Sequence, residues 1–115
     1  MMANRHRGEV AARLDGRDWI LCLTLGALAE LETAFETDNL SDLIARFSTG
    51  RLSARDMLRI LCAGLRGGGH VVSEDDVAEM RADGGAAGFA RIVAALLTAT
   101  FGTPEKLESD SPSNP

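Results

Sequence analysis

The sequence contains no tyrosine, one tryptophan and four phenylalanines among its 115 residues. So few aromatic side chains leave little for stacking on nucleic-acid bases. A formal net charge of -5 also lacks the basic excess that nucleic-acid-binding proteins normally carry. No apolar run approaches the roughly 18 residues that a membrane helix needs, and none follows the basic N-terminus as in a secretory signal. We therefore expect a cytoplasmic protein that binds neither nucleic acid nor membranes.

Residues that commonly carry chemistry are also scarce. Cys22 and Cys62 lie inside apolar runs with no spacing that suits zinc, so we expect reduced core residues. His6 and His70 belong to no recognisable triad pattern, and we expect both at the surface. The acids around Asp76 lack the alternating order of a calcium-binding loop. The sequence therefore predicts no enzyme, no metal site and no cofactor.

Proline and glycine mark the boundaries of the chain's parts. All three prolines fall in the last 14 residues, GTPEKLESDSPSNP, whose composition cannot bury enough apolar surface to become ordered. We expect a flexible arm over residues 1–8, a single domain over 9–102 and a disordered acidic tail over 103–115. The glycine-rich stretch DGGAAG precedes a predicted helix, which leaves an anion site at that helix N-terminus as an alternative.

Residues 9–24 alternate as a β-hairpin about Asp15-Gly16, a dipeptide in which both positions can take positive φ. This turn fixes the register, and the predicted pairs are Leu14 with Arg17, Ala12 with Trp19, and Val10 with Leu21. These side chains and Leu23 share one face of the hairpin. A lone hairpin is marginally stable in water, so this face requires a cover.

Beyond the hairpin the apolar period changes from two to 3.6, which predicts four short helices. They run from Leu25 to near Thr37-Asp38, from Leu40 to Gly50, from Ser53 to the Gly67-Gly68-Gly69 stop, and from Ser73 to Gly84-Gly85. Thr24 is placed to cap the first helix. Ser53 with Asp56, and Ser73 with Asp76, have the spacing of capping boxes.

The most regular apolar pattern lies in residues 86–101, AAGFARIVAALLTATF. Its apolar residues fall at i, i+3, i+4, i+7, i+8 and i+12, which is one face of a helix. They are Phe89, Ile92, Val93, Leu96, Leu97 and Phe101. We expect this to be the central helix of the domain, with any partner groove beside it, between less regular elements. An exposed Ile92 or Leu96 would contradict that expectation.

Together these patterns predict an α+β fold that is mostly α. An N-terminal β-hairpin precedes about five short helices, which pack with it into a compact bundle. The predicted core consists of Val10, Trp19, Leu21, Leu28, Leu31, Leu43, Phe47, Leu58, Leu61, Phe89, Ile92, Val93, Leu96 and Leu97.

Four arginines form the one charge pattern that suggests a contact surface: Arg51, Arg55, Arg59 and Arg66. At about 100° per residue they fall within a strip about 80° wide, beside the apolar face of the third predicted helix. Two interpretations stay open. The strip is either a solvated flank, paired in part with the acidic fourth helix, or a contact surface for an acidic protein partner.

Three segments carry a resemblance to a known family: NRHRGEVAARLDGRDWILCLTLGALAELETAF, GRLSARDMLRILCAGLRGGGH and EDDVAEMRADGGAAGFARIVAALL. Over residues 4–101 the chain resembles small phage-type proteins of gene transfer agents, which are grouped with tail assembly chaperones. The resemblance implies a non-enzymatic chaperone that binds the tape measure protein, with the tail tube protein as a further partner, and it implies no cofactor. Self-association stays open, as does the alternative of a tube or connector subunit in the particle.

Overall fold

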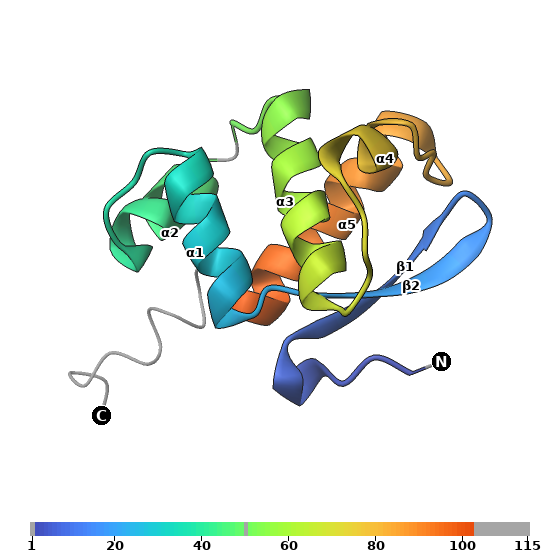
Figure 1. The fold of residues 1–115 in the computed structure, drawn as a ribbon, viewed down its shortest axis with the longest axis horizontal. Helices are drawn as coiled ribbons and strands as arrows, with labels where there is room; N and C mark the ends of the chain where they lie inside the picture. Colours follow the sequence, from blue (N-terminus) through green and yellow to red (C-terminus); the bar gives the residue numbers. More distant parts are fainter. Residues whose placement is uncertain (1, 50, 103–115) are drawn as a thin grey trace.

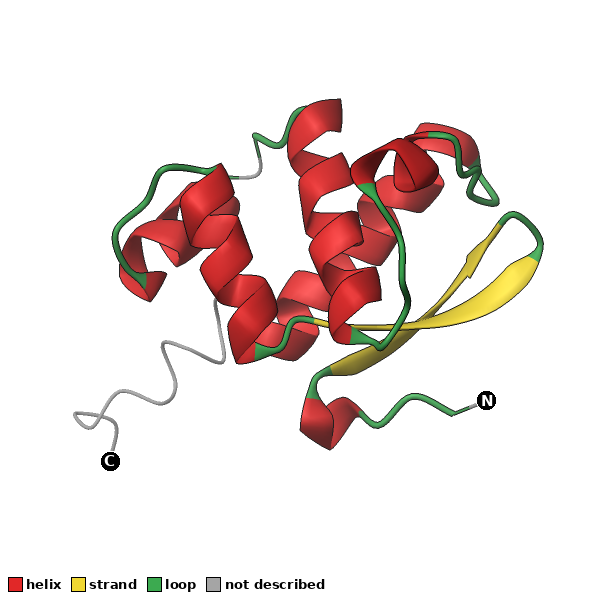
Figure 2. Ribbon diagram, viewed as in Figure 1, coloured by secondary structure: helices red, strands yellow, loops and turns green. Residues whose placement is uncertain are grey.

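The computed structural model describes residues 2–49 and 51–102. Their elements, in chain order, are η1 (Arg5–Arg7), β1 (Glu9–Leu14), β2 (Arg17–Cys22), α1 (Leu25–Ala34), α2 (Leu40–Ser48), α3 (Ala54–Gly67), α4 (Glu74–Ala78) and α5 (Gly85–Phe101). A hairpin followed by five α-helices confirms the predicted α+β, mostly α fold (Figure 1). Figure 2 shows the two strands of the hairpin running along one side of the helical part of the molecule. The predicted tail over 103–115 lies outside the described residues.

The hairpin forms in the predicted register, with Leu14 opposite Arg17 and Val10 opposite Leu21. Asp15 and Gly16 both take positive φ, 56° and 70°, as a tight two-residue turn requires. One face of the hairpin is buried beneath the helices: α3 packs on β2, and α5 packs on β1. Trp19 lies on this face, where its indole Nε1 donates a hydrogen bond of 3.0 Å to the carbonyl of Leu14.

The end of α3 lies directly against the outer edge of β2. A Cβ atom added to Gly67 or Gly68 would overlap the carbonyl oxygen of Cys22 or Ile20, so only glycine allows this approach. His70 follows and lies 3.2 Å, through Nε2, from the same Ile20 carbonyl. Its ring stands edge-on to Trp19, 4.9 Å between centroids. His70 is therefore half-buried and structural, which corrects the expectation of a surface side chain.

The predicted helix starts are present. The Thr24 hydroxyl accepts from the backbone of Ala27, and the two serine–aspartate capping boxes open α3 and α4. One helix end lies earlier than predicted. The first helix ends at Ala34, and Glu36 just beyond it takes a left-handed φ of 55°. The second helix ends at Ser48, and the predicted stop at residue 50 lies outside the described residues.

The fourth helix is also shorter than predicted, because the residues that follow it pair with the hairpin. The helix ends at Ala78 rather than at Gly84-Gly85. The chain then returns to the hairpin tip, where Ala82 forms a bridge with Leu14. The Asp15 amide donates to the Arg81 carbonyl at 2.8 Å, which fastens the turn to this segment.

The core lies between the hairpin, α1, α3 and α5. Val93 and Leu96 of α5 are buried, with 1% and 0% of their surface exposed, and Ile92 is half-buried. The residues predicted for the core that are buried are Val10, Trp19, Leu21, Leu28, Leu31, Leu43, Phe47, Leu61, Val93 and Leu96. The others, Leu58, Phe89, Ile92 and Leu97, are half-buried against this core. Three of them line open cavities, as described below.

Both cysteines are free, as their spacing indicates. Cys62 is buried and Cys22 is half-buried. Burial raises the pKa of both thiols, and the Glu9 carboxylate raises the pKa of Cys22 further. The neutral thiol is therefore favoured at neutral pH, and neither cysteine is prepared as a nucleophile.

Candidate partner-binding trough

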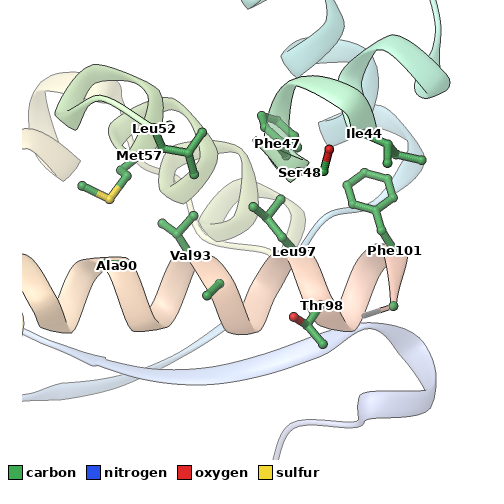
Figure 3. Close-up of a pocket in the computed structure, with 12 residues that line it drawn as sticks. Ile44, Phe47, Ser48, Leu52, Met57, Ala90, Val93, Leu97, Thr98 and Phe101 are labelled. Carbon is green, nitrogen blue, oxygen red and sulfur yellow. The ribbon is translucent and has the colours of Figure 1, made fainter. Parts of the chain in front are cut away.

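An apolar cavity of about 490 Å³ opens along α5, opposite α2 and the start of α3. Val93 points from α5 toward Met57 and Leu52, and Leu97 points from α5 toward Phe47 (Figure 3). The other residues that line this cavity come from α2 and α5. They are Ile44, Phe47 and Ser48 of α2, Ala90, Ala94, Thr98 and Phe101 of α5, and Gly102 directly after α5. None of the described residues that line this cavity is charged, so its described surface is apolar.

A second cavity, of about 690 Å³, lies on the other side of Met57. It is bounded by α3, α4 and the start of α5, and Leu58, Met80 and Phe89 form its apolar wall. Met57 lines both cavities. We refer to the two cavities and the shared Met57 as the α5 trough.

A series of aromatic contacts connects the core to one end of the α5 trough. Phe35 and Phe47 pack edge-to-face with their centroids 5.5 Å apart, and Phe47 lies 6.4 Å from Phe101. Phe35 and Phe47 are buried, whereas Phe101 is half-buried at the mouth. The trough therefore rests on a packed wall, which favours a preformed binding surface.

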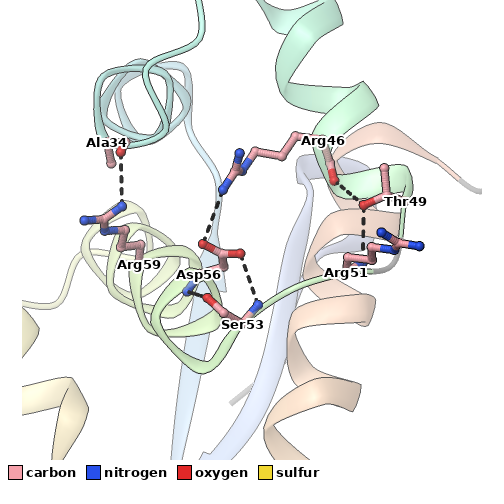
Figure 4. Close-up of polar contacts among 7 residues, drawn as sticks. All are labelled: Ala34, Arg46, Thr49, Arg51, Ser53, Asp56 and Arg59. Atoms are coloured by element: carbon pink, nitrogen blue, oxygen red, sulfur yellow. Dashed lines mark hydrogen bonds and ion pairs between the residues drawn. The ribbon is translucent and has the colours of Figure 1, made fainter.

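The arginine strip divides into two pairs in the structure. Arg59 is half-buried and donates a 3.1 Å hydrogen bond to the Ala34 carbonyl at the end of α1 (Figure 4). Arg66 donates through Nε to the Val72 carbonyl at 2.9 Å and lies 3.4 Å from a Glu30 carboxylate oxygen. These two arginines hold elements of the fold together, which favours a structural role for them.

Arg51 and Arg55 are exposed instead. Arg55 lines the second cavity, and Arg51 precedes Leu52 of the first. Among the residues that the structure describes, neither guanidinium has a carboxylate within ion-pair distance. Only this half of the strip is free to contact a partner.

A polar contact that no sequence pattern predicted joins α2 to α3. Arg46 lies 3.7 Å from the buried Asp56 carboxylate, the same group that caps α3 at Ser53 (Figure 4). The Arg46 guanidinium also lies 4.8 Å above the Phe35 ring. Spacing could not have predicted this contact, because it joins separate elements through a loop. It fixes the wall of the trough that α2 provides.

Neither catalytic nor metal-binding geometry emerges in the described ranges. Within residues 2–49 and 51–102, no three histidine, cysteine, aspartate or glutamate side chains are grouped to hold a metal ion. The same residues contain no helix of the length and apolarity needed to span a bilayer. Among the described residues the α5 trough is one open surface with a largely apolar lining, which is the kind of surface that takes up an apolar part of another protein.

Fold and trough therefore describe a small α+β domain with an open, largely apolar surface. The chain belongs to a family described as phage tail tube protein, GTA-gp10, whose model matches residues 7–103. This confirms the part of the resemblance that placed the chain among gene transfer agent and phage tail proteins. The family description names a tube protein rather than an assembly chaperone. No curated protein and no solved structure matches the chain.

Proposed function

We propose that this chain is a structural component of a phage-type tail, incorporated as a tube or connector subunit. The observation that carries the proposal is the family match over residues 7–103, which includes the hairpin and all five helices. The match thus concerns the whole described domain, and the family's description is that of a tail tube protein. A tail role accounts for a small domain without catalytic geometry.

The fold limits how such a subunit would contact its neighbours. Tube subunits meet through repeated contacts between different surfaces of identical chains. The outer edge of β2 is covered at Ile20 and Cys22 by the end of α3, so strand addition at that edge is blocked. We propose that the contacts of this chain with its neighbours use helix surfaces, among them the apolar lining of the α5 trough.

The second candidate is a tail assembly chaperone that binds the tape measure protein and leaves before the particle is complete. The α5 trough favours it, because an open apolar groove can cover an amphipathic helix of a partner until assembly. A chaperone and a tube subunit need the same kind of surface. They differ in whether the chain stays in the tail.

Quantitative mass spectrometry of purified particles separates the two candidates. A structural subunit is expected in a fixed ratio to the other tail proteins. Absence from intact particles, combined with co-purification of the tape measure protein from the assembling cell, would replace the subunit by the chaperone. Absence from particles without any tail protein as a partner would contradict both.

A further inference from the structure

The outer edge of β1 is the side of the hairpin that faces away from β2. In the observed register, the even-numbered residues of β1 bond to β2 and the odd-numbered residues face outward. The Glu9 amide accordingly donates away from β2, to the Asn4 carbonyl at 3.0 Å. Just beyond the strand, the Asp15 amide donates to the Arg81 carbonyl. Ala11 lies on the same edge, between these two contacts.

The middle of this edge is open. The N–H and C=O of Ala11, the C=O of Glu9 and the N–H of Arg13 face outward, and no hydrogen bond joins them to another of the described residues. Ala11 and Arg13 are exposed, and the hairpin runs along one side of the helical part of the molecule (Figure 2). The edge of β2 differs, because the end of α3 covers it. An exposed row of unpaired backbone groups is a template for another strand.

The charges on this edge are arranged symmetrically about Ala11. Glu9 lies two residues before Ala11 and Arg13 two residues after it, so all three project from the face of the hairpin opposite to the buried one. A second β1 strand that pairs antiparallel, with Ala11 opposite Ala11, places each Glu9 opposite an Arg13 of the other copy. Pairing centred on Glu9 or on Arg13 would instead place like charges opposite each other, which is destabilising. The edge is therefore complementary to itself in one register.

We propose that two copies of this chain pair through β1 about a two-fold axis at Ala11, which joins their hairpins into one antiparallel sheet. Each Ala11 amide donates to the Ala11 carbonyl of the other copy, and each Arg13 amide donates to the Glu9 carbonyl of the other copy. The Glu9 amide keeps its bond to Asn4. Every open group of the edge thus receives a partner.

The present contacts of the two charged side chains leave room for the new ion pairs. Arg13 lies 3.3 Å from the Asp18 carboxylate through Nη1, and a guanidinium has further donors. One Glu9 oxygen accepts from the Asn4 amide at 2.8 Å, and the other lies 3.8 Å from the Arg7 guanidinium. Carboxylate oxygens accept more than one hydrogen bond, so Glu9 can also receive Arg13 of the other copy.

This pairing differs from the contacts of a tube. Both copies contribute the same surface, so the contact closes after two copies and cannot by itself build a tube. It is therefore a property of the free chain, and it goes beyond the proposed tail function.

Sedimentation velocity of the full chain tests the pairing. A contact through one strand edge is small and predicts a weak dimer, which should appear between about 10 µM and about 1 mM. A chain that is still monomeric at about 1 mM would overturn the proposal.

Charge reversal on the edge gives the specific test. Arg13→Glu should raise the dissociation constant of the dimer about tenfold, because each dimer contains the pair of Glu9 and Arg13 twice. Glu9→Arg should have the same effect. An equimolar mixture of the two variants should dimerise again, since opposite charges then face each other in both pairs. Arg55→Glu makes the same charge change at an exposed position of α3 and should leave the dissociation constant unchanged.

Amide exchange measured by NMR locates the contact, and circular dichroism melting confirms that each variant is folded. Exchange of the Ala11 and Arg13 amides should slow as the concentration of the native chain rises through the dimer range. A dimer that leaves these amides unprotected, or a mixture of the two variants that stays monomeric, would contradict pairing through β1. These measurements use the isolated chain, so their failure is distinguishable from failure of the proposed tail function, which the particle composition decides.

Discussion

Single glycines decide how closely α3 approaches the hairpin. Gly68→Ala should lower the free energy of unfolding by about 2–3 kcal/mol, because the added Cβ would overlap the Ile20 carbonyl oxygen and force the two elements apart. Its backbone angles suit alanine, so the cost arises from the overlap alone. Urea denaturation measures the change.

Gly26→Ala is the matched control for this glycine. Gly26 lies exposed in the first turn of α1, where an added Cβ would meet only the Thr24 hydroxyl at an ordinary 3.9 Å. We expect its stability to change by no more than about 0.5 kcal/mol. Equal losses in the two variants would show that the contact with β2 is not the cause.

One capping carboxylate makes the stability of α4 depend on pH. The backbone N–H of Ser73 and, secondly, its hydroxyl hydrogen-bond to Asp76 and hold the pKa of that carboxyl below its usual value. A depressed pKa in the folded state adds stability above the unfolded pKa, and this stability is lost as the pH falls through the folded pKa. The difference in stability between the native chain and Asp76→Asn should therefore shrink as the pH falls below about 4.

Asp75→Asn removes a neighbouring charge from the same helix turn and serves as the control. Asp75 is not the capping residue, since the amide that Ser73 caps and the carboxylate that accepts from Ser73 both belong to Asp76. Denaturation curves across the acid range compare the two variants. If the Asp75→Asn difference shrinks equally, the pH dependence reflects general charge rather than the cap.

At the scale of elements, α5 serves both the core and the trough. Leu96→Ala should lower the free energy of unfolding by about 3 kcal/mol, because Leu96 is fully buried and its loss leaves a cavity. Leu97→Ala should cost only about 1 kcal/mol, since Leu97 is half-buried and faces the trough.

Denaturant titration of the two variants measures both losses. Equal effects on stability would contradict the division of α5 into a buried and a trough-facing side.

Features of the fold that are set by residues close together in the sequence could be predicted from it. The Asp15-Gly16 turn fixed the hairpin register, and the serine–aspartate spacing located the starts of α3 and α4. The early end of α4 could not be predicted, because it follows from a bridge between Leu14 and Ala82, far apart in the sequence. The same holds for Arg59, whose acceptor is the carbonyl of Ala34.

The trough was only partly predictable for a related reason. Periodicity identifies apolar faces but does not show which faces other elements leave uncovered. Leu58, Phe89 and Leu97 therefore fit the core pattern, although they border open cavities. We expected a groove beside the regular helix, whereas α5 itself provides Val93, Leu97 and Phe101 to the groove.

At the scale of the whole molecule, the buried core of the described residues begins at Val10 and ends at Leu96. A chain that ends at Gly102 should therefore melt at the same temperature as the full chain, in agreement with a single domain over residues 9–102. A chain that ends at Ala94 loses the buried Leu96 and should not fold cooperatively. Calorimetry of both truncations tests this domain boundary, and a lower melting temperature of the first would extend the domain into residues 103–115.

Met57, which lines both cavities of the trough, has a consequence for the choice of partners. A methionine side chain is unbranched and polarizable, so it can shift to fit differently shaped neighbours at little cost. A trough divided by such a residue would select a partner by its pattern of apolar positions rather than by one particular sequence. Such a surface would keep its affinity for a partner whose sequence changes during evolution.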